Sequence, residues 1–143
     1  MPLELTGEPE NVSVADTAKL VRFALAKAFS GQKFTVHYLT RDMAVRVYWV
    51  GGPSQREVNQ VIERYSGGGL ELDIDAYYWH EHYLLPDGSA FIRYSEGTIG
   101  LGGHYHKIDN RYFDEIAPEG TRRVKFKAFY ISGERDDSEQ PLS

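Results

Sequence analysis

The chain has 143 residues, contains no cysteine and carries a formal net charge of −5 at pH 7. Without thiols it has no disulfide, thiolate metal site or cysteine nucleophile. Its net negative charge argues against a broad basic surface that would bind nucleic acid electrostatically. Hydrophobic residues make up 41% of the sequence, and the absence of a membrane-length apolar run or a basic–apolar leader pattern predicts a globular protein of the cytoplasm.

A first helix is predicted over residues 14–29. Ser13 and Asp16 have the spacing of a capping box, in which side chains satisfy the free amides of a helix start. Apolar residues then recur at helical spacing, and Gly31 follows at a position where helices commonly end. The apolar residues of this stripe are Val14, Ala18, Val21, Leu25, Ala28 and Phe29.

A β-hairpin over residues 33–50 and a second helix over residues 54–65 are predicted next. Apolar and polar residues alternate on both sides of a turn at 40–42, which is the pattern of two half-buried strands. Ser54 and Glu57 repeat the capping-box spacing, and glycines at 67–69 end the helix. The residues expected in the core of this unit are Val21, Leu25, Val36, Val47, Trp49, Val61 and Ile62.

The second half of the chain is predicted to be mainly strands. Strands are expected at 70–76, 90–94 and 124–130, with a turn at 86–88 and a hairpin partner at 98–106, while residues 77–85 either continue the first strand or turn helical. The whole sequence therefore predicts an α+β fold, in which two helices pack on an antiparallel sheet of about five strands that opens with an α-β-β-α unit. One domain is expected at 13–132, between a flexible N-terminus at 1–12 and a disordered tail at 133–143.

The opening unit also has a family resemblance, which rests on three runs of residues. They are Thr17-Ala18-Lys19-Leu20-Val21-Arg22-x-Ala24-Leu25, Phe29-x-Gly31-x-Lys33-Phe34-x-Val36 and Val45-x-Val47-x-Trp49 with Gly52-Pro53, followed by Val58, Val61, Ile62 and Tyr65. This succession resembles the large polyvalent protein-associated domains, which are accessory modules of very long proteins carried by phages and plasmids. The resemblance covers about residues 14–78. It implies the fold of this half and a mobile-element setting, and it supplies no catalytic residue.

Four of the five histidines form two His-x-His pairs, His80 with His82 and His104 with His106. Residues two apart on a strand point the same way, so each pair can present two imidazoles to one divalent metal ion. Adjacent strands would bring both pairs together. The oxygen ligands would then come from Glu81, Asp73 or Asp75. The alternative is an aromatic patch in which the histidines are ordinary amphipathic surface residues.

A row of carboxylates and a group of aromatic residues predict a binding surface at 71–83. Alternate carboxylates on a strand stand about 6.6–6.8 Å apart, so the row can imitate a phosphate backbone and be steered toward a basic protein. Exposed tyrosine and tryptophan are common anchors of protein interfaces. The alternative is a solvated strand face with some of the rings in the core. The residues of this candidate surface are Glu71, Asp73, Asp75, Tyr77, Tyr78, Trp79 and Tyr83.

Three classes of function compete on this sequence. The favoured one is a non-enzymatic module of a phage or plasmid that binds a host protein, such as a nucleic-acid-binding defence protein, in an anti-CRISPR or anti-restriction role. The second is a metal-binding protein or metal-dependent enzyme that uses the His-x-His pairs. The third is a nucleic-acid-binding module, which would use a basic run interleaved with aromatic rings. That run contains Arg122, Arg123, Lys125 and Lys127 beside Phe126 and Phe129.

Overall fold

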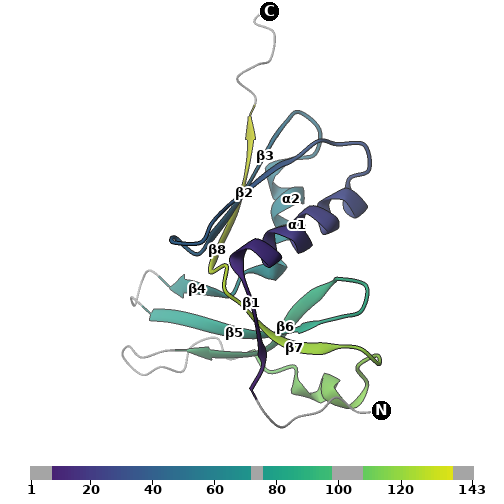
Figure 1. Ribbon diagram of the computed structural model, residues 1–143, viewed down its shortest axis with the longest axis vertical. Coiled ribbons are helices and arrows are strands. Elements are labelled where there is room, and N and C mark those ends of the chain that lie inside the picture. Colours follow the sequence, from purple (N-terminus) through teal and green to yellow (C-terminus); the bar gives the residue numbers. More distant parts are fainter. Residues whose placement is uncertain (1–7, 72–75, 98–107, 137–143) are drawn as a thin grey trace, which may run out of the picture.

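The computed structural model describes residues 8–71, 76–97 and 108–136. In this part of the chain, two helices and two separate β-sheets form a mixed α+β fold (Figure 1). The elements are β1 (Glu10–Val12), α1 (Val14–Ala28), β2 (Thr35–Leu39), β3 (Ala44–Val50), α2 (Gln55–Ile62), η1 (Glu63–Tyr65), β4 (Gly68–Glu71), β5 (Ala76–Leu84), β6 (Ala90–Gly97), η2 (Arg111–Glu115), β7 (Arg122–Phe126) and β8 (Tyr130–Asp136).

Both predicted helices are present and both begin at the predicted caps. The Ser13 hydroxyl accepts a hydrogen bond from the Asp16 amide at 3.0 Å. At the start of α2, the Ser54 hydroxyl accepts from the Glu57 amide at 3.1 Å while the Glu57 carboxylate accepts from the Ser54 amide at 3.0 Å, which is a complete capping box. No helix in the described part of the chain combines the length and the apolar character needed to cross a membrane.

The smaller sheet has three strands in the order β2-β3-β8. β2 and β3 form the predicted antiparallel hairpin, and β8 runs parallel to β3 on its other side. Both helices pack on one face of this sheet (Figure 1). The expected core is confirmed except that Val61 is only partly buried. The buried members are Val21, Leu25, Val36, Val47, Trp49 and Ile62.

The larger sheet has five strands, and it corrects the expectation of one antiparallel sheet. β4 and β7 pair with successive parts of one edge of β5, β6 pairs along the other edge, and β1 pairs in parallel with β7. The expected sheet is therefore two sheets, each with one parallel pair. Local alternation predicts that a strand exists but does not say which distant strand it pairs with.

The predicted final strand is also two strands, one in each sheet. β7 ends at Phe126 and β8 begins at Tyr130, and the residues between them carry the chain from the larger sheet to the smaller one (Figure 1). Ala128 and Phe129 are both buried, whereas a continuous strand would place them on opposite faces. β8 continues to Asp136 and so includes the first four residues of the segment expected as a tail.

Candidate functional site

The candidate binding residues on β5 differ in their exposure to solvent. Trp79 is 43% exposed, whereas Tyr83 is fully buried. Asp73 and Asp75 lie outside the described residues, as do the side chains of Glu71, Tyr77 and Tyr78. Trp79 is therefore the residue of the predicted surface that the structure places at the solvent.

Trp79 is the start of a larger exposed apolar surface that crosses from one sheet to the other. Its ring meets the ring of Phe129 at a centroid distance of 4.9 Å, and Phe129 meets Tyr130 at 4.8 Å. Tyr130 lies in one row of the smaller sheet with Ala44 and Leu39, and its amide donates to the carbonyl of Met43 at 3.0 Å. We call Trp79, Tyr130, Leu39 and Met43, with the buried Phe129 beneath, the aromatic surface.

The aromatic surface has the composition of an interface centre with a polar border. Its four exposed members are between 39% and 50% exposed. The next row of the smaller sheet holds His37, Arg46 and Ser132, all exposed. An apolar, aromatic centre beside a polar rim is the usual arrangement of a protein–protein interface.

The sequence predicts Trp79 as a binding residue, and it does not predict Tyr130, Leu39 or Met43 as members of the same surface. Tyr130 lies at the end of the predicted final strand, and Leu39 and Met43 flank the predicted hairpin turn at 40–42. Their proximity to Trp79 depends on the pairing of β3 with β8, which has no local signature.

The first His-x-His pair lies on the face of β5 that turns toward the helices. The ring centroids of His80 and His82 are 5.8 Å apart, and His80 Nδ1 shares a hydrogen bond of 3.0 Å with the Ser95 hydroxyl. His104 and His106 lie outside the described residues. Among the residues that the structure describes, no group of three His, Asp or Glu side chains is placed to hold a metal ion.

His82 is a buried histidine in an apolar setting. It is 1% exposed, its ring lies 4.8 Å from that of Phe126, and neither ring nitrogen has a hydrogen-bond partner. Burial lowers the pKa of His82 to about 3 and His80 adds to the decrease, while the Arg64 backbone, which lies near the ring without meeting hydrogen-bond geometry, opposes it. His82 is therefore neutral at physiological pH and fills the core like an apolar ring.

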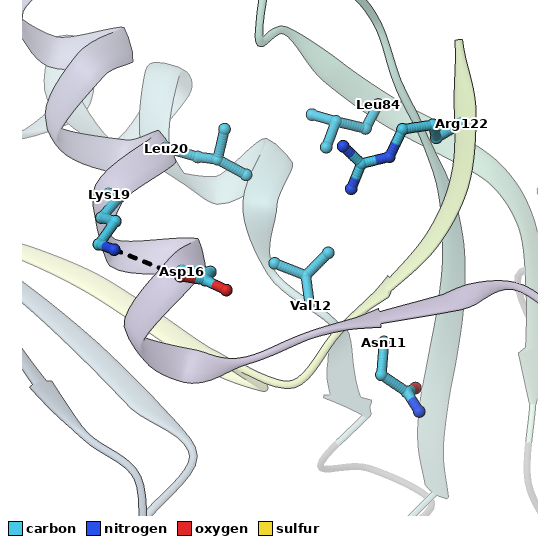
Figure 2. Close-up of a pocket in the computed structure, with 7 residues that line it drawn as sticks. All are labelled: Asn11, Val12, Asp16, Lys19, Leu20, Leu84 and Arg122. Atoms are coloured by element: carbon cyan, nitrogen blue, oxygen red, sulfur yellow. Dashed lines mark ion pairs between the residues drawn. The ribbon is translucent and has the colours of Figure 1, made fainter. Parts of the chain in front are cut away.

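A hollow of about 350 Å³ opens between α1 and the larger sheet (Figure 2). Leu20, Val12 and Leu84 form its apolar lining, and the Arg122 guanidinium points toward it. Lys19 lies at the rim in an exposed pair with Asp16 at 3.6 Å. The residues that line the hollow come from α1, β1, β5 and β7.

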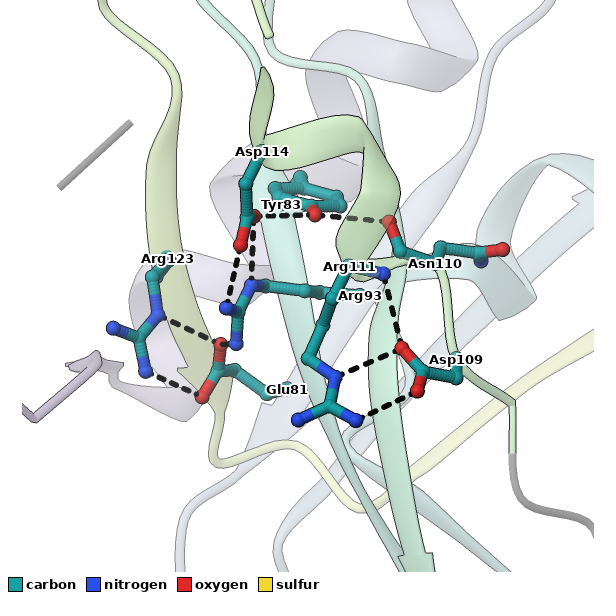
Figure 3. Close-up of polar contacts among 8 residues, drawn as sticks. All are labelled: Glu81, Tyr83, Arg93, Asp109, Asn110, Arg111, Asp114 and Arg123. Atoms are coloured by element: carbon teal, nitrogen blue, oxygen red, sulfur yellow. Dashed lines mark hydrogen bonds and ion pairs between the residues drawn. The ribbon is translucent and has the colours of Figure 1, made fainter. Parts of the chain in front are cut away.

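A network of ion pairs covers the opposite face of β5 (Figure 3). Arg93 donates two hydrogen bonds to the two carboxylate oxygens of Asp114, at 2.9 and 2.7 Å, and a third to Glu81 at 2.6 Å. Arg123 donates to both oxygens of Glu81, at 2.8 and 3.0 Å. The Tyr83 hydroxyl donates to Asp114 at 2.6 Å. We call these five residues the ionic network.

The ionic network attaches η2 to the larger sheet. Arg93 is the extra residue of a β-bulge in β6, where the register shifts opposite Glu81 and His82, and bulges commonly redirect side chains. Burial would raise the pKa of Asp114, but hydrogen bonds from Arg93 and Tyr83 outweigh burial and lower it. Both carboxylates of the ionic network are paired with arginines. Such pairing is typical of a structural ion-pair cluster and not of a reactive centre.

The basic run of β7 does not present its aromatic rings to solvent. Phe126 and Phe129 are 2% and 4% exposed. Arg122 pairs with Glu10 at 2.7 Å, and Arg123 belongs to the ionic network. Lys125 and Lys127 are exposed. Base stacking on these rings would require the core to open.

Comparison with known proteins identifies one family. The model of large polyvalent protein associated domain 29 matches residues 12–138. No curated protein and no solved structure matches the chain. The match extends well beyond residues 14–78, and it covers all strands of both sheets except the first two residues of β1.

Proposed function

We propose a function on the premise that the chain belongs to the family of large polyvalent protein associated domain 29, whose model spans residues 12–138. This family places the chain among the modules of phages and other mobile genetic elements. In that setting the chain acts without catalysis, by binding a protein of the host cell. The binding site is the aromatic surface.

The observation that carries this proposal is the exposure of Trp79 and Tyr130 at the point where the two sheets meet. Their side chains are 43% and 50% exposed although each ring contacts the buried Phe129. An aromatic ring that is fixed on one side by a core residue loses little side-chain freedom when a partner covers the other side. Tryptophan and tyrosine in this position are the residues that most often dominate binding energy.

The charge of the chain supports a basic host partner. The net charge is −5, and an acidic protein approaches a basic one faster than a neutral one. Proteins that bind nucleic acid carry such basic surfaces, so a nucleic-acid-binding defence protein of the host fits the proposal. The acidic row Glu71, Asp73 and Asp75, which joins β4 to β5 in the sequence, would then contribute to steering by resembling a phosphate backbone.

Site-specific photo-cross-linking tests the proposal. A photoreactive phenylalanine analogue at Tyr130 of the full chain, expressed in host cells, should cross-link one host protein. The matched control carries the analogue at Tyr112, which is 70% exposed on η2 and lies outside the aromatic surface. Equal labelling from both positions would contradict a specific interface.

Affinity measurements on the identified partner complete the test. Trp79→Ala together with Tyr130→Ala should weaken binding at least about thirtyfold, because truncating a central aromatic anchor costs about 2 kcal/mol or more. Tyr112→Ala should leave the affinity unchanged. If the double variant remains folded and binds as tightly as the parent chain, the aromatic surface is not the binding site.

A further inference from the structure

A second surface feature runs along α1, where three neighbouring hollows share lining residues. The hollow of Figure 2 shares Leu20, Leu84 and Arg122 with a neighbour of about 190 Å³. That neighbour shares Gly88 with a third hollow of about 250 Å³. We call this the α1 groove. Its lining on the helix extends from Asp16 to Ala28, which corresponds to about 18 Å along the helix axis.

The groove has an apolar floor. Leu20, Leu84, Val61 and Pro86 line it, and Phe23 stands beside it with 57% of its surface exposed. The Phe23 ring is in reach of the turn after β5, since a Cβ at Gly88 would lie 3.5 Å from it. A large apolar side chain at the rim of an apolar groove is a ready contact for an incoming apolar side chain.

The rim of the groove is basic although the chain is acidic. Among the described residues that line the three hollows, four are cations and two are carboxylates, a local balance of +2 against −5 for the whole chain. The cations are Lys19, Lys27, Arg64 and Arg122, and the carboxylates are Asp16 and Asp87. The pairs of Lys19 with Asp16 and of Arg122 with Glu10 are solvent-exposed, so an incoming carboxylate can replace Asp16 or Glu10 at little cost.

We propose that the α1 groove binds an amphipathic helix of a partner protein, with acidic side chains on both sides of an apolar stripe. The apolar floor of the groove is about as long as three turns of a helix, and its rims are basic. It is therefore the complement of such a helix, which anchors through apolar residues at i, i+3, i+4 and i+7. An extended peptide would instead need a strand edge to pair with. The strand at this end of the groove, β1, has only three residues.

The α1 groove is separate from the aromatic surface. Leu84 at the end of β5 lines the groove, while Trp79 near its start belongs to the aromatic surface. They are five positions apart on the strand, or about 17 Å. The chain therefore presents two sites from different elements, and each can be tested while the other stays intact.

Two synthetic peptides of fourteen residues test the proposal with the full chain. The acidic peptide has leucine at the i, i+3, i+4, i+7 positions and glutamate on both flanks, and the basic peptide has lysine in place of each glutamate. The acidic peptide should bind at least about tenfold more tightly than the basic one in a fluorescence anisotropy titration. Added salt should reduce this preference, because part of it is electrostatic.

Charge reversal in the groove identifies the site. Lys27→Glu together with Arg122→Glu should reverse the preference, so that the basic peptide binds more tightly. The matched control is Lys125→Glu together with Lys127→Glu, which changes the net charge equally at exposed positions outside the groove and should preserve the preference for the acidic peptide. Phe23→Ala, a milder change at an exposed residue, should weaken the acidic peptide about fivefold or more.

Three outcomes would overturn the proposal: no binding of either peptide below about 1 mM, equal affinity for the two peptides, or a preference that survives charge reversal in the groove. Trp79→Ala with Tyr130→Ala should leave peptide binding unchanged. Loss of peptide binding in that variant, with the fold intact by circular dichroism, would move the peptide site to the aromatic surface and would also overturn the proposal.

Discussion

Replacing Arg93 with alanine should be among the most destabilising single changes in this chain. Arg93 bonds both oxygens of Asp114 and one of Glu81, and the three side chains are only 5% to 12% exposed. Without Arg93, Glu81 retains Arg123, whereas Asp114 retains the neutral hydroxyl of Tyr83. Removing one partner from a buried ion pair costs about 3–5 kcal/mol, because the remaining charge has lost its compensation.

Urea unfolding followed by circular dichroism measures this free energy. The matched control is Arg111→Ala, which also breaks an arginine–aspartate pair at 2.7 Å, but one whose partners Arg111 and Asp109 are 51% and 46% exposed. The control should cost much less than Arg93→Ala, because solvent-exposed ion pairs contribute little to stability. Hydrogen exchange should also increase at η2 in Arg93→Ala, because the network holds this turn on the sheet. If the free energies of unfolding of the two variants differ by less than about 1 kcal/mol, burial does not determine how much these ion pairs stabilise the fold, and the prediction is wrong.

Two further predictions concern the core. Leu25→Ala and Ile62→Ala, both at fully buried positions, should each cost about 2–5 kcal/mol through the cavity they leave; losses below about 1 kcal/mol in urea unfolding would show that the core is misplaced. His82→Leu should be neutral or stabilising at pH 7, because both ring nitrogens lack partners. The pKa of His82 falls from 6.5 in the unfolded chain to about 3 in the fold. The unfolded state therefore binds the proton first, and His82 costs stability as pH falls from 6.5 toward 3, by up to about 1.4 kcal/mol per unit. His82→Leu should flatten this slope in unfolding measured across that range, and an unchanged slope would contradict the assignment.

The helices and the hairpin were predictable because their signals are local. Ser13, Ser54 and Glu57 cap helices through bonds that span three residues, and such bonds leave a fixed spacing in the sequence. The hairpin alternates around one short turn, so its register follows from the turn. In both cases the residues that decide the structure are neighbours along the chain.

The separation into two sheets was not predictable, because it depends on distant pairings. β1 pairs with β7, more than a hundred residues away, and β8 pairs with β3 across the whole middle of the chain. The buried pair Ala128 and Phe129, where the chain changes sheets, was a readable break in the alternation. It does not say which sheet the chain joins next.

The candidate site was only partly predictable for the same reason. The sequence predicts Trp79 and Tyr83 on one binding surface. Trp79 is exposed, whereas η2 covers Tyr83, whose ring lies 5.0 Å from that of Phe113. The members of the ionic network come from β5, β6, η2 and β7. Charged residues scattered in this way look like ordinary surface residues until the strands are paired.

The late position of β7 and β8 has a consequence for how the chain acquires its structure during synthesis. Each sheet contains one strand from the last quarter of the described residues, and each of these strands pairs in parallel with a much earlier one. Pairings of this kind require long loops to close and form slowly. A nascent chain therefore leaves one edge of β3 without its partner strand on the ribosome until about residue 136 has emerged. Premature termination before β7 should yield a product that proteases degrade and chaperones bind, since neither sheet can then be completed.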